Sequence, residues 1–492
     1  MSERTIIDRI VSYFNPEAGM RRMQARKVIS YYEAAKPSRT RKFRRDQGGP
    51  NVQTQQGAVA IRTQARHLEQ NHDIARGILR TIVDNVVGPH GIGIEPQPRR
   101  RDGSIHKEFA EQLIEAYRDW QRHPEVTGRF HWARVQRLVC RTWIRDGEAF
   151  AQQLIGPIPT LDHGSRVPYS LELFEPDMVP YSLRDDSRGI RQGIELNAWG
   201  RPRAYWIHKY HPTDGVVLPS STDLKRIPAD KILHIANIDR IGQVRGVSEF
   251  ASVITRLEDI KDYEESERVA AKIAAMLTAY VKRGTPDHMD PDALPRDEDG
   301  NIRPREISLE PGAIIDTLEI GEEIGVIDSK RPNPNLVTFR QGQLKALAGG
   351  VGATYSSIAK DYNGTFSAQR QELIEQWVHY AVLTDEFTGR FVQPVWDAFV
   401  RAAHLAGAVT IPDDVIPGTE DDALFIGQQL PWIDPLKEAS AWVKLVRAGF
   451  ASEAEVIRKR GQNPDDVLNQ IERFRRAARE KGLQFESDFS AE

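Results

Sequence analysis

One stretch of the chain, Val247–Arg283, runs for 37 residues without glycine or proline, and it constrains the fold more than any other feature. As a single α-helix it would be on the order of 55 Å long, whereas most helices in globular proteins make about three or four turns. Apolar residues recur at helical spacing near both ends, and the charged residues Lys261–Arg268 separate them. Two interpretations are open: a helix buried in the core of a large domain, or a strut between two bodies that packs against copies of itself.

Small side chains line one side of the second half of this stretch. A helix with such a thin side allows the backbone of another helix to approach closely. We therefore predict that these residues form a packing contact between subunits if the stretch is a strut: Ala270, Ala271, Ala274 and Ala275.

Length and charge limit the class of protein. The 492 residues are enough for about two to four domains. The net charge of −3 does not favour a nucleic-acid binder, but the charge is uneven: residues 1–50 hold 12 Lys and Arg against 5 Asp and Glu, and residues 285–337 hold 5 against 13. This asymmetry predicts different surroundings for the two regions.

The single cysteine, Cys140, excludes an intramolecular disulfide and fits a reducing compartment. It lies in an apolar helical pattern, so we expect a buried, unreactive thiol. The sequence has no run of 18 apolar residues and its N-terminus carries charges where a signal peptide is apolar. We expect a soluble intracellular product with no membrane partner.

The N-terminal half reads as helices followed by a sheet. Residues 5–34 are amphipathic, and residues 36–56 look like an extended basic linker. Helical periodicity runs from Gly57 to Val87 and returns at about 105–121 and 131–145. Residues 147–237 alternate in hydropathy between turn residues, which predicts a mixed, largely antiparallel sheet with a hairpin loop at Asn197–Gly200. The linker's basic residues resemble a nucleic-acid patch, with a solvated arm as an equal alternative: Arg39, Arg41, Lys42, Arg44 and Arg45.

In the C-terminal half, helix caps are the clearest signals. Thr338 with Gln341 matches a capping box, Gly349–Gly350 ends that helix, and residues 353–366 are polar and irregular. Ser367 is expected to cap a helical run to Leu405 that bends at Pro394. Three short helices then follow within residues 434–482, with predicted caps at Asp434, Ser452 and Asn463 and predicted ends at Gly449, Gly461 and Gly482.

Motifs for catalysis, cofactors and metals are weak throughout. Gly88–Gly93 follows a helix rather than a strand, and Gly349–Gly352 lacks the lysine of a phosphate-binding loop. Asp297–Asn301 has its glycine at the wrong position for a calcium loop. His208 and His211 have no third ligand nearby in the sequence, and a turn explains the close carboxylates Asp146 and Glu148. We expect no enzymatic activity, no cofactor and no metal.

Several segments together make the chain resemble the lambda-type portal proteins of tailed bacteriophages over roughly residues 20 to 480. Each segment is weakly specific alone, and their order and spacing carry the resemblance. They are Tyr31–Ala35, Asn85–Gly88, Gly193–Glu195 with Tyr205–Trp206, Gln243–Gly246, Pro311–Gly312 with Gly321–Glu322, Thr365–Arg370 and Trp432–Ala439.

The resemblance implies an α+β, predominantly helical portal fold that assembles into a dodecameric ring at one capsid vertex. Its parts would be an N-terminal helix and arm (1–56), wing (57–246), stem helix (247–284), clip (285–337), second stem helix (338–352), tunnel loop (353–366), wing return (367–433), crown (434–482) and a disordered tail (483–492). The acidic insert and the helix that returns after it favour the strut interpretation, with Val269–Arg283 as the surest part of the stem.

The same resemblance implies the function and the partners. Double-stranded DNA would be packaged through the ring by the large terminase subunit and later ejected, and the ring would also contact major capsid protein or scaffold and a head–tail adaptor. The protein would be made in the host bacterial cytoplasm and reside in the virion. Implied site residues are Lys360, Asp361 and Asn363 in the tunnel loop, and Asp297, Glu298 and Asp299 on an acidic clip.

Two other classes remain as alternatives. A capsid-associated protease or nuclease would need a catalytic triad or a metal-binding acidic cluster, and the sequence has neither. A generic helical scaffold would account for the long helix and the caps, but it leaves the basic arm and the acidic insert unexplained.

Overall fold

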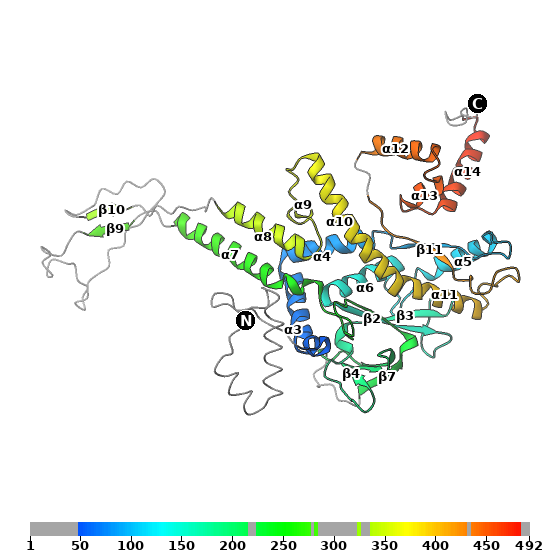
Figure 1. Ribbon diagram of the computed structural model, residues 1–492, viewed down its shortest axis with the longest axis horizontal. Coiled ribbons are helices and arrows are strands. Elements are labelled where there is room, and N and C mark those ends of the chain that lie inside the picture. The colour runs from blue at the N-terminus through cyan, green and yellow to red at the C-terminus, as the bar shows by residue number, and fades with distance from the viewer. Residues whose placement is uncertain are drawn as a thin grey trace, which may run out of the picture. The chain divides into compact units, whose positions relative to one another are not determined.

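The computed structural model describes residues 48–214, 223–276, 280–283, 322–325, 335–430 and 434–483. The chain divides into two compact units, Met1–Gln53 and Thr54–Glu492, and the second holds almost all the described residues. The α-helices are α3 (Pro50–Asn71), α4 (Asp73–Val86), α5 (Lys107–Trp120), α6 (Trp132–Asp146), α7 (Ile254–Met276), α8 (Leu336–Gly350), α9 (Tyr355–Ala359), α10 (Phe366–Phe387), α11 (Gln393–Leu405), α12 (Pro435–Arg447), α13 (Glu453–Arg458) and α14 (Pro464–Glu480) (Figure 1).

The sheets are small and antiparallel, as the alternation over residues 147–237 predicts. One has the strand order β3-β2-β8 and another β4-β5-β6-β7, while β1 pairs with β11 and β9 with β10. The hairpin loop at Asn197–Gly200 is confirmed, because the Asn197 side-chain oxygen accepts hydrogen bonds from the backbone N–H groups of Trp199 and Arg201, both at 2.9 Å. The strands are β1 (Gly93–Pro96), β2 (Glu148–Ile155), β3 (Tyr169–Phe174), β4 (Ile190–Arg191), β5 (Ile194–Leu196), β6 (Pro202–His208), β7 (Leu224–Pro228), β8 (Ile232–Ala236), β9 (Tyr280–Arg283), β10 (Glu322–Gly325) and β11 (Ala423–Ile426).

Aromatic side chains from α5, α6 and α11 form the centre of the main core. Trp120, Trp143 and Trp396 are fully buried. Trp120 stacks on Tyr169 with ring centroids 5.4 Å apart, and its indole N–H donates to the backbone carbonyl of Tyr169 at 2.8 Å. Cys140 is fully buried, as predicted, and burial raises the pKa of its thiol, which disfavours the reactive thiolate.

The helix predicted from Gly57 to Val87 is in fact two helices. α3 starts at Pro50, inside the predicted linker 36–56, and His72 separates it from α4. The backbone of His72 is extended, and its Nδ1 accepts a hydrogen bond from the N–H of Ile74. Its Nε2 therefore carries the proton and donates to the carbonyl of Leu257 at 3.1 Å, which ties the break to α7.

The prediction of one helix over residues 247–284 is wrong at both ends. A short 3₁₀ turn, Glu249–Ser252, comes first, and α7 covers only Ile254–Met276. Tyr280–Arg283 is strand β9, paired antiparallel with β10. Leu257 and Ile260 in the first half of α7 are buried in the main core, so this half is a core helix.

The helices after the insert also differ in their boundaries. α8 begins at Leu336 instead of Thr338, and the stretch 353–366, predicted to be irregular, contains helix α9. α10 is capped by Thr365 instead of the predicted Ser367. The Thr365 side chain accepts a hydrogen bond from the N–H of Ala368. A π-helical turn, Thr388–Val392, interrupts the α-helical run just before Pro394, whose missing N–H cannot continue the normal helical ladder.

The caps of the last three helices are confirmed. Asp434 accepts from the N–H of Lys437, Ser452 from that of Glu455, and Asn463 from those of Asp465 and Asp466. The three predicted terminal glycines all have positive φ angles, which suits glycine because it lacks a Cβ: Gly449, Gly461 and Gly482.

Asp397 on α11 is predicted to make stability depend on pH. Burial and the nearby Asp421 raise its pKa to about 6, against a partial opposing effect of Arg401. Because this pKa lies above the unfolded value of about 4, the folded state binds the proton more tightly, and stability falls as the pH rises from about 4 to about 6. Asp397→Asn should therefore raise Tm above about pH 6 and flatten the Tm–pH curve below it. The exposed Asp84→Asn is the control, and equal curves for both variants would contradict the prediction.

Candidate functional site

A buried ion pair holds the segment that leads into α7. Arg245 and Glu148 are both fully buried, and the guanidinium donates to the carboxylate at 2.6 Å from Nη2 and 2.9 Å from Nε. Arg245 also donates to the carbonyls of Val179 and Gln192, and lies 3.9 Å from the centroid of the Tyr181 ring. The pair joins strand β2 to the approach to α7, 97 residues later in the chain.

The Glu148 carboxylate has three further donors. They are the Tyr181 hydroxyl and the His234 Nε2, each at 3.1 Å, and the Gly246 N–H at 3.0 Å. Burial alone would raise the pKa of Glu148, but Arg245 and the hydrogen bond from His234 hold it far below its usual value. Glu148 is thus ionised and enclosed, so it can position the chain but cannot exchange protons with a substrate.

Two glycines let the backbone cross itself beside this pair. A Cβ on Gly147, whose φ is +89°, would lie 2.2 Å from the carbonyl carbon of Val247, and one on Gly246 would lie 2.0 Å from the carbonyl oxygen of Gly147. The interpretation of residues 146–148 as a turn is confirmed, since Gly147 caps α6 in the left-handed conformation. The structural role of Glu148 is not visible in the sequence, where its partners lie far away.

A second cluster of charges joins α3, α6 and the turn after β3. Arg66 donates to Asp146 and to Asp177, both at 2.7 Å, and Arg145 donates to Asp146 at 2.7 Å and to Glu69 at 2.9 Å. Positive and negative side chains alternate, so each of these charges has an oppositely charged partner. The same contacts hold α3 against α6.

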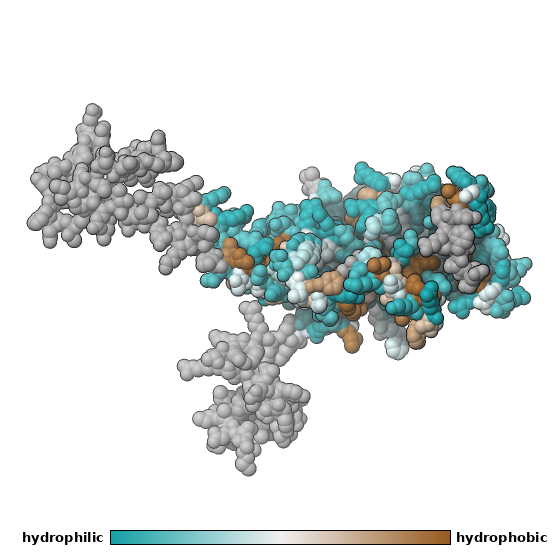
Figure 2. All heavy atoms as spheres, turned by 90° about the horizontal axis from the view of Figure 1, so that it is seen from above, coloured by the Kyte–Doolittle hydropathy of each residue, from teal (hydrophilic) through white to brown (hydrophobic). Residues whose placement is uncertain are grey.

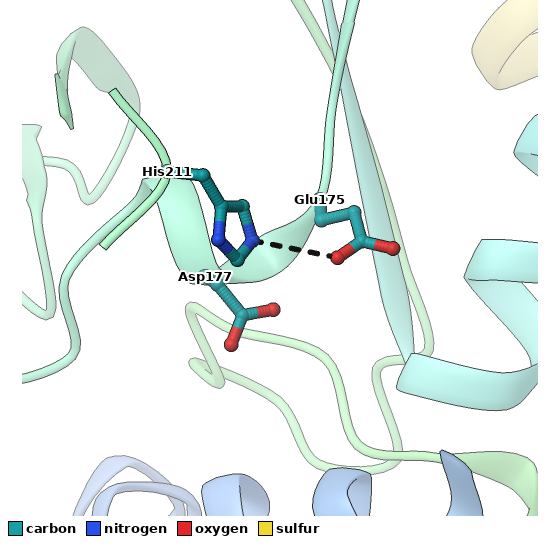
Figure 3. Close-up of side chains that lie close together, drawn as sticks. All are labelled: Glu175, Asp177 and His211. Atoms are coloured by element: carbon teal, nitrogen blue, oxygen red, sulfur yellow. Dashed lines mark ion pairs between the residues drawn. The ribbon is translucent and has the colours of Figure 1, made fainter. Parts of the chain in front are cut away.

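Within this region, three side chains have the spacing of a metal site. The ligand atoms of Glu175, Asp177 and His211 lie within 4.8 Å of one another (Figure 3). These two carboxylates come from a segment more than thirty residues away, so the absence of a third ligand near His208 and His211 in the sequence did not reveal them. However, Arg66 lies 2.7 Å from Asp177 and 3.3 Å from Glu175, and Arg62 lies 3.0 Å from Asp177. Both carboxylates already have cationic partners that would repel a metal ion, which favours an ion-pair network.

Helices α7 and α8 lie side by side (Figure 1). Arg340 on α8 pairs with Glu264 on α7 at 2.5 Å, and the rings of Tyr263 and Phe339 lie 4.8 Å apart. Of the four predicted packing alanines, Ala270 is half-buried and Ala271 is exposed. Ala274 and Ala275 belong to the backbone of α7, and their side chains lie outside the described part.

The predicted tunnel-loop residues lie close together. Asp361 accepts hydrogen bonds from the Tyr355 hydroxyl at 2.9 Å and from the Asn363 side-chain amide at 2.8 Å. Asp361 therefore holds the shape of its own loop. Lys360 is exposed and has the left-handed backbone conformation, with φ of 54°. Lys360 is therefore the more exposed of the two charged residues, since Asp361 is half-buried.

Polar contacts with α10 hold the start of this loop in place. The Thr354 hydroxyl donates to the Gln376 side-chain oxygen at 3.1 Å, and the Gln376 side-chain amide donates to the Ser357 hydroxyl at 3.0 Å. Ser356 donates to Glu372. These hydrogen bonds fix the start of the loop against α10.

Two groups of predicted residues lie outside the described residues. These are the clip carboxylates Asp297, Glu298 and Asp299, and the arm residues Arg39, Arg41, Lys42, Arg44 and Arg45. Among the helices that are described, none combines the length and apolar character needed to cross a membrane.

Known proteins resemble this chain over most of its length. Residues 36–383 match the family described as phage portal protein, lambda family. A probable portal protein of Halomonas phage phiHAP-1 is 27% identical over 429 residues, covering 84% of this chain and 79% of the relative. Portal protein B of Escherichia phage lambda is 21% identical over 326 residues, covering 61% of this chain and 60% of the relative. A chain from the virion of a native gene transfer agent particle aligns with 89% of this chain and 99% of its own, at 12% identity and a TM-score of 0.44.

Proposed function

Because the chain belongs to the lambda family of phage portal proteins, we propose that it forms the ring-shaped channel at one capsid vertex through which double-stranded DNA is packaged and later ejected. The family match carries this proposal, since it spans the three-stranded and four-stranded sheets, α7, α8, the loop after α8 and most of α10. The ring would reside in the virion, and its partners would be the large terminase subunit, major capsid protein or scaffold, and a head–tail adaptor.

The proposed parts follow the described elements. The three-stranded and four-stranded sheets with α3 to α6 form the wing, α7 and α8 the stem, residues 285–337 the clip, and residues 353–366 the tunnel loop. Residues 367–433 return to the wing, and α12 to α14 form the crown. The exposed side of α7 carries Glu258, Asp262 and Glu265, four and then three residues apart. Carboxylates do not hold phosphates, which suits a conduit along which DNA must slide.

The mass of the purified native protein tests the proposal. Twelve copies of the 55.7 kDa chain would give about 670 kDa in a closed ring. Analytical ultracentrifugation should find a single large species, and a neighbouring ring size would also support a closed ring. A stable monomer or dimer would overturn the proposal.

Removing the charge of Lys360 is expected to reduce DNA packaging severalfold while leaving rings intact. Glycine is the suitable replacement, because Lys360 has a left-handed backbone that glycine adopts without strain. Lys360→Gly is introduced into phage particles, and nuclease-protected DNA per particle is measured. The exposed Lys231→Gly, away from the loop, is the control. If rings fail to form with Lys360→Gly, the residue is structural and the tunnel-loop assignment is wrong.

A further inference from the structure

One face of α10 exposes a row of apolar side chains. Ile374, Val378 and Val382 follow one another at four-residue spacing, and Val378 and Val382 are 63% and 60% exposed. Glu375 and Asp385 lie on the same face of the helix, because 3.6 residues make a turn. Neither carboxylate forms an ion pair with another described residue. These five residues form an apolar stripe bordered by two carboxylates, called the α10 face below, and the exposed Arg370 lies one turn before it.

Helix α12 exposes a stripe of the same kind with the opposite charge. Leu436 and Val443 lie on one side of the helix, and Phe450 follows its end, with Leu436 79% and Phe450 80% exposed. Lys444 and Arg447 border this side and are exposed. These five residues are called the α12 face.

The α12 face has no core of its own to support it. α12 buries none of its residues, and among the described residues 434–483 only Ala478 is buried. A unit of this size needs a covered apolar face to be stable. Figure 2 shows hydrophobic patches lying between hydrophilic residues on one side of the described part.

We propose that the α12 face of one subunit packs on the α10 face of the neighbouring subunit. This inference rests on the proposed ring and names a contact that would close it. A head-to-tail ring requires two different, complementary surfaces on every subunit. The two faces fit this requirement, because both are apolar, one has an acidic border, the other a basic border, and both belong to the same chain. In a ring of identical subunits, every α10 face therefore has one α12 face available from a neighbouring subunit.

Cross-linking between two differently tagged variants tests the contact directly. Val378→Cys in one subunit and Val443→Cys in the other are assembled together and treated with a short bismaleimide. Cys140 is fully buried with a raised pKa, so it should not react. The expected product is a covalent dimer that contains one copy of each tag. Assembled rings that give no such dimer, or dimers of one tag only, would overturn the proposal.

Charge reversal provides the second test. Glu375→Lys with Asp385→Lys, or Lys444→Glu with Arg447→Glu, should weaken ring assembly roughly tenfold through like-charge repulsion. All four substitutions in one chain should restore assembly, because the attraction is re-formed with opposite signs. Asp84→Lys with Glu111→Lys, at exposed carboxylates outside both faces, is the matched control.

The outcomes separate this inference from the proposed function. If the unsubstituted protein forms no ring, the proposed function fails. If it forms rings but the reversals assemble normally and the mixed cross-link is absent, only the contact between these two faces is wrong.

Discussion

Replacing Arg245 with leucine is expected to lower the free energy of unfolding by about 3–5 kcal/mol, because it leaves the Glu148 carboxylate buried without its cation. Glu148 would keep its hydrogen bonds from Tyr181, His234 and Gly246. None of these groups carries the full positive charge that offsets the cost of removing the carboxylate from water. A large fall in the urea midpoint and in Tm should follow.

Two further variants make the Arg245 result specific. Arg184 pairs with Asp186 on the surface, so Arg184→Leu removes an exposed ion pair and should change stability little. The double variant Glu148→Leu with Arg245→Leu removes both buried charges and should be more stable than Arg245→Leu alone. If Arg245→Leu unfolds at the same urea concentration as Arg184→Leu, the buried pair does not have the proposed role.

Replacing Gly147 with alanine is expected to lower the free energy of unfolding by roughly 2–5 kcal/mol, because two costs add there. The φ of +89° disfavours any residue with a Cβ. The new Cβ would also lie 2.2 Å from the backbone of Val247, and backbone atoms cannot rotate away as a side chain can. Thermal and urea unfolding of the purified protein give the measurement.

Gly103 separates these two costs. Its φ is +84°, close to that of Gly147, but no atom lies within 4 Å of the position that a Cβ would take. Gly103→Ala should therefore show only the conformational cost, about 1–2 kcal/mol. Equal destabilisation by Gly103→Ala and Gly147→Ala would mean that the crossing of residues 147 and 247 relaxes, contrary to the prediction.

Local signals in the sequence were sufficient for the caps and turns of the chain. The caps at Asp434, Ser452 and Asn463 depend on hydrogen bonds to residues two or three positions away, and the loop at Asn197 on bonds two and four positions away. The partners are neighbours in the sequence, so residue type and spacing predict the contact. The strands were predictable from a local signal too, the period-two alternation, but the pairing of β2 with β8, more than eighty residues later, was not.

Contacts between distant segments decided the features that the sequence could not show. His211 meets Glu175 and Asp177 only after β3 and β6 are placed, and the arginines that occupy these carboxylates come from α3. The spacing of the two histidines could indicate neither the acidic neighbours nor the cations that make a metal site unfavourable.

The stretch without glycine or proline, Val247–Arg283, shows both what the sequence determined and what the tertiary structure decided. Its composition determined that much of it would be helical, and its apolar periodicity determined which side of the first half would be buried. Only the tertiary structure decided that the helix is limited to Ile254–Met276 and that Tyr280–Arg283 is a strand. The N-terminal limit follows a turn capped by Ser248, and β9 pairs with β10 some forty residues away. The segment that leads into α7 is held by the ion pair between Arg245 and Glu148. A buried charge requires an oppositely charged partner, and only the folded chain brings these two residues, 97 positions apart, into contact.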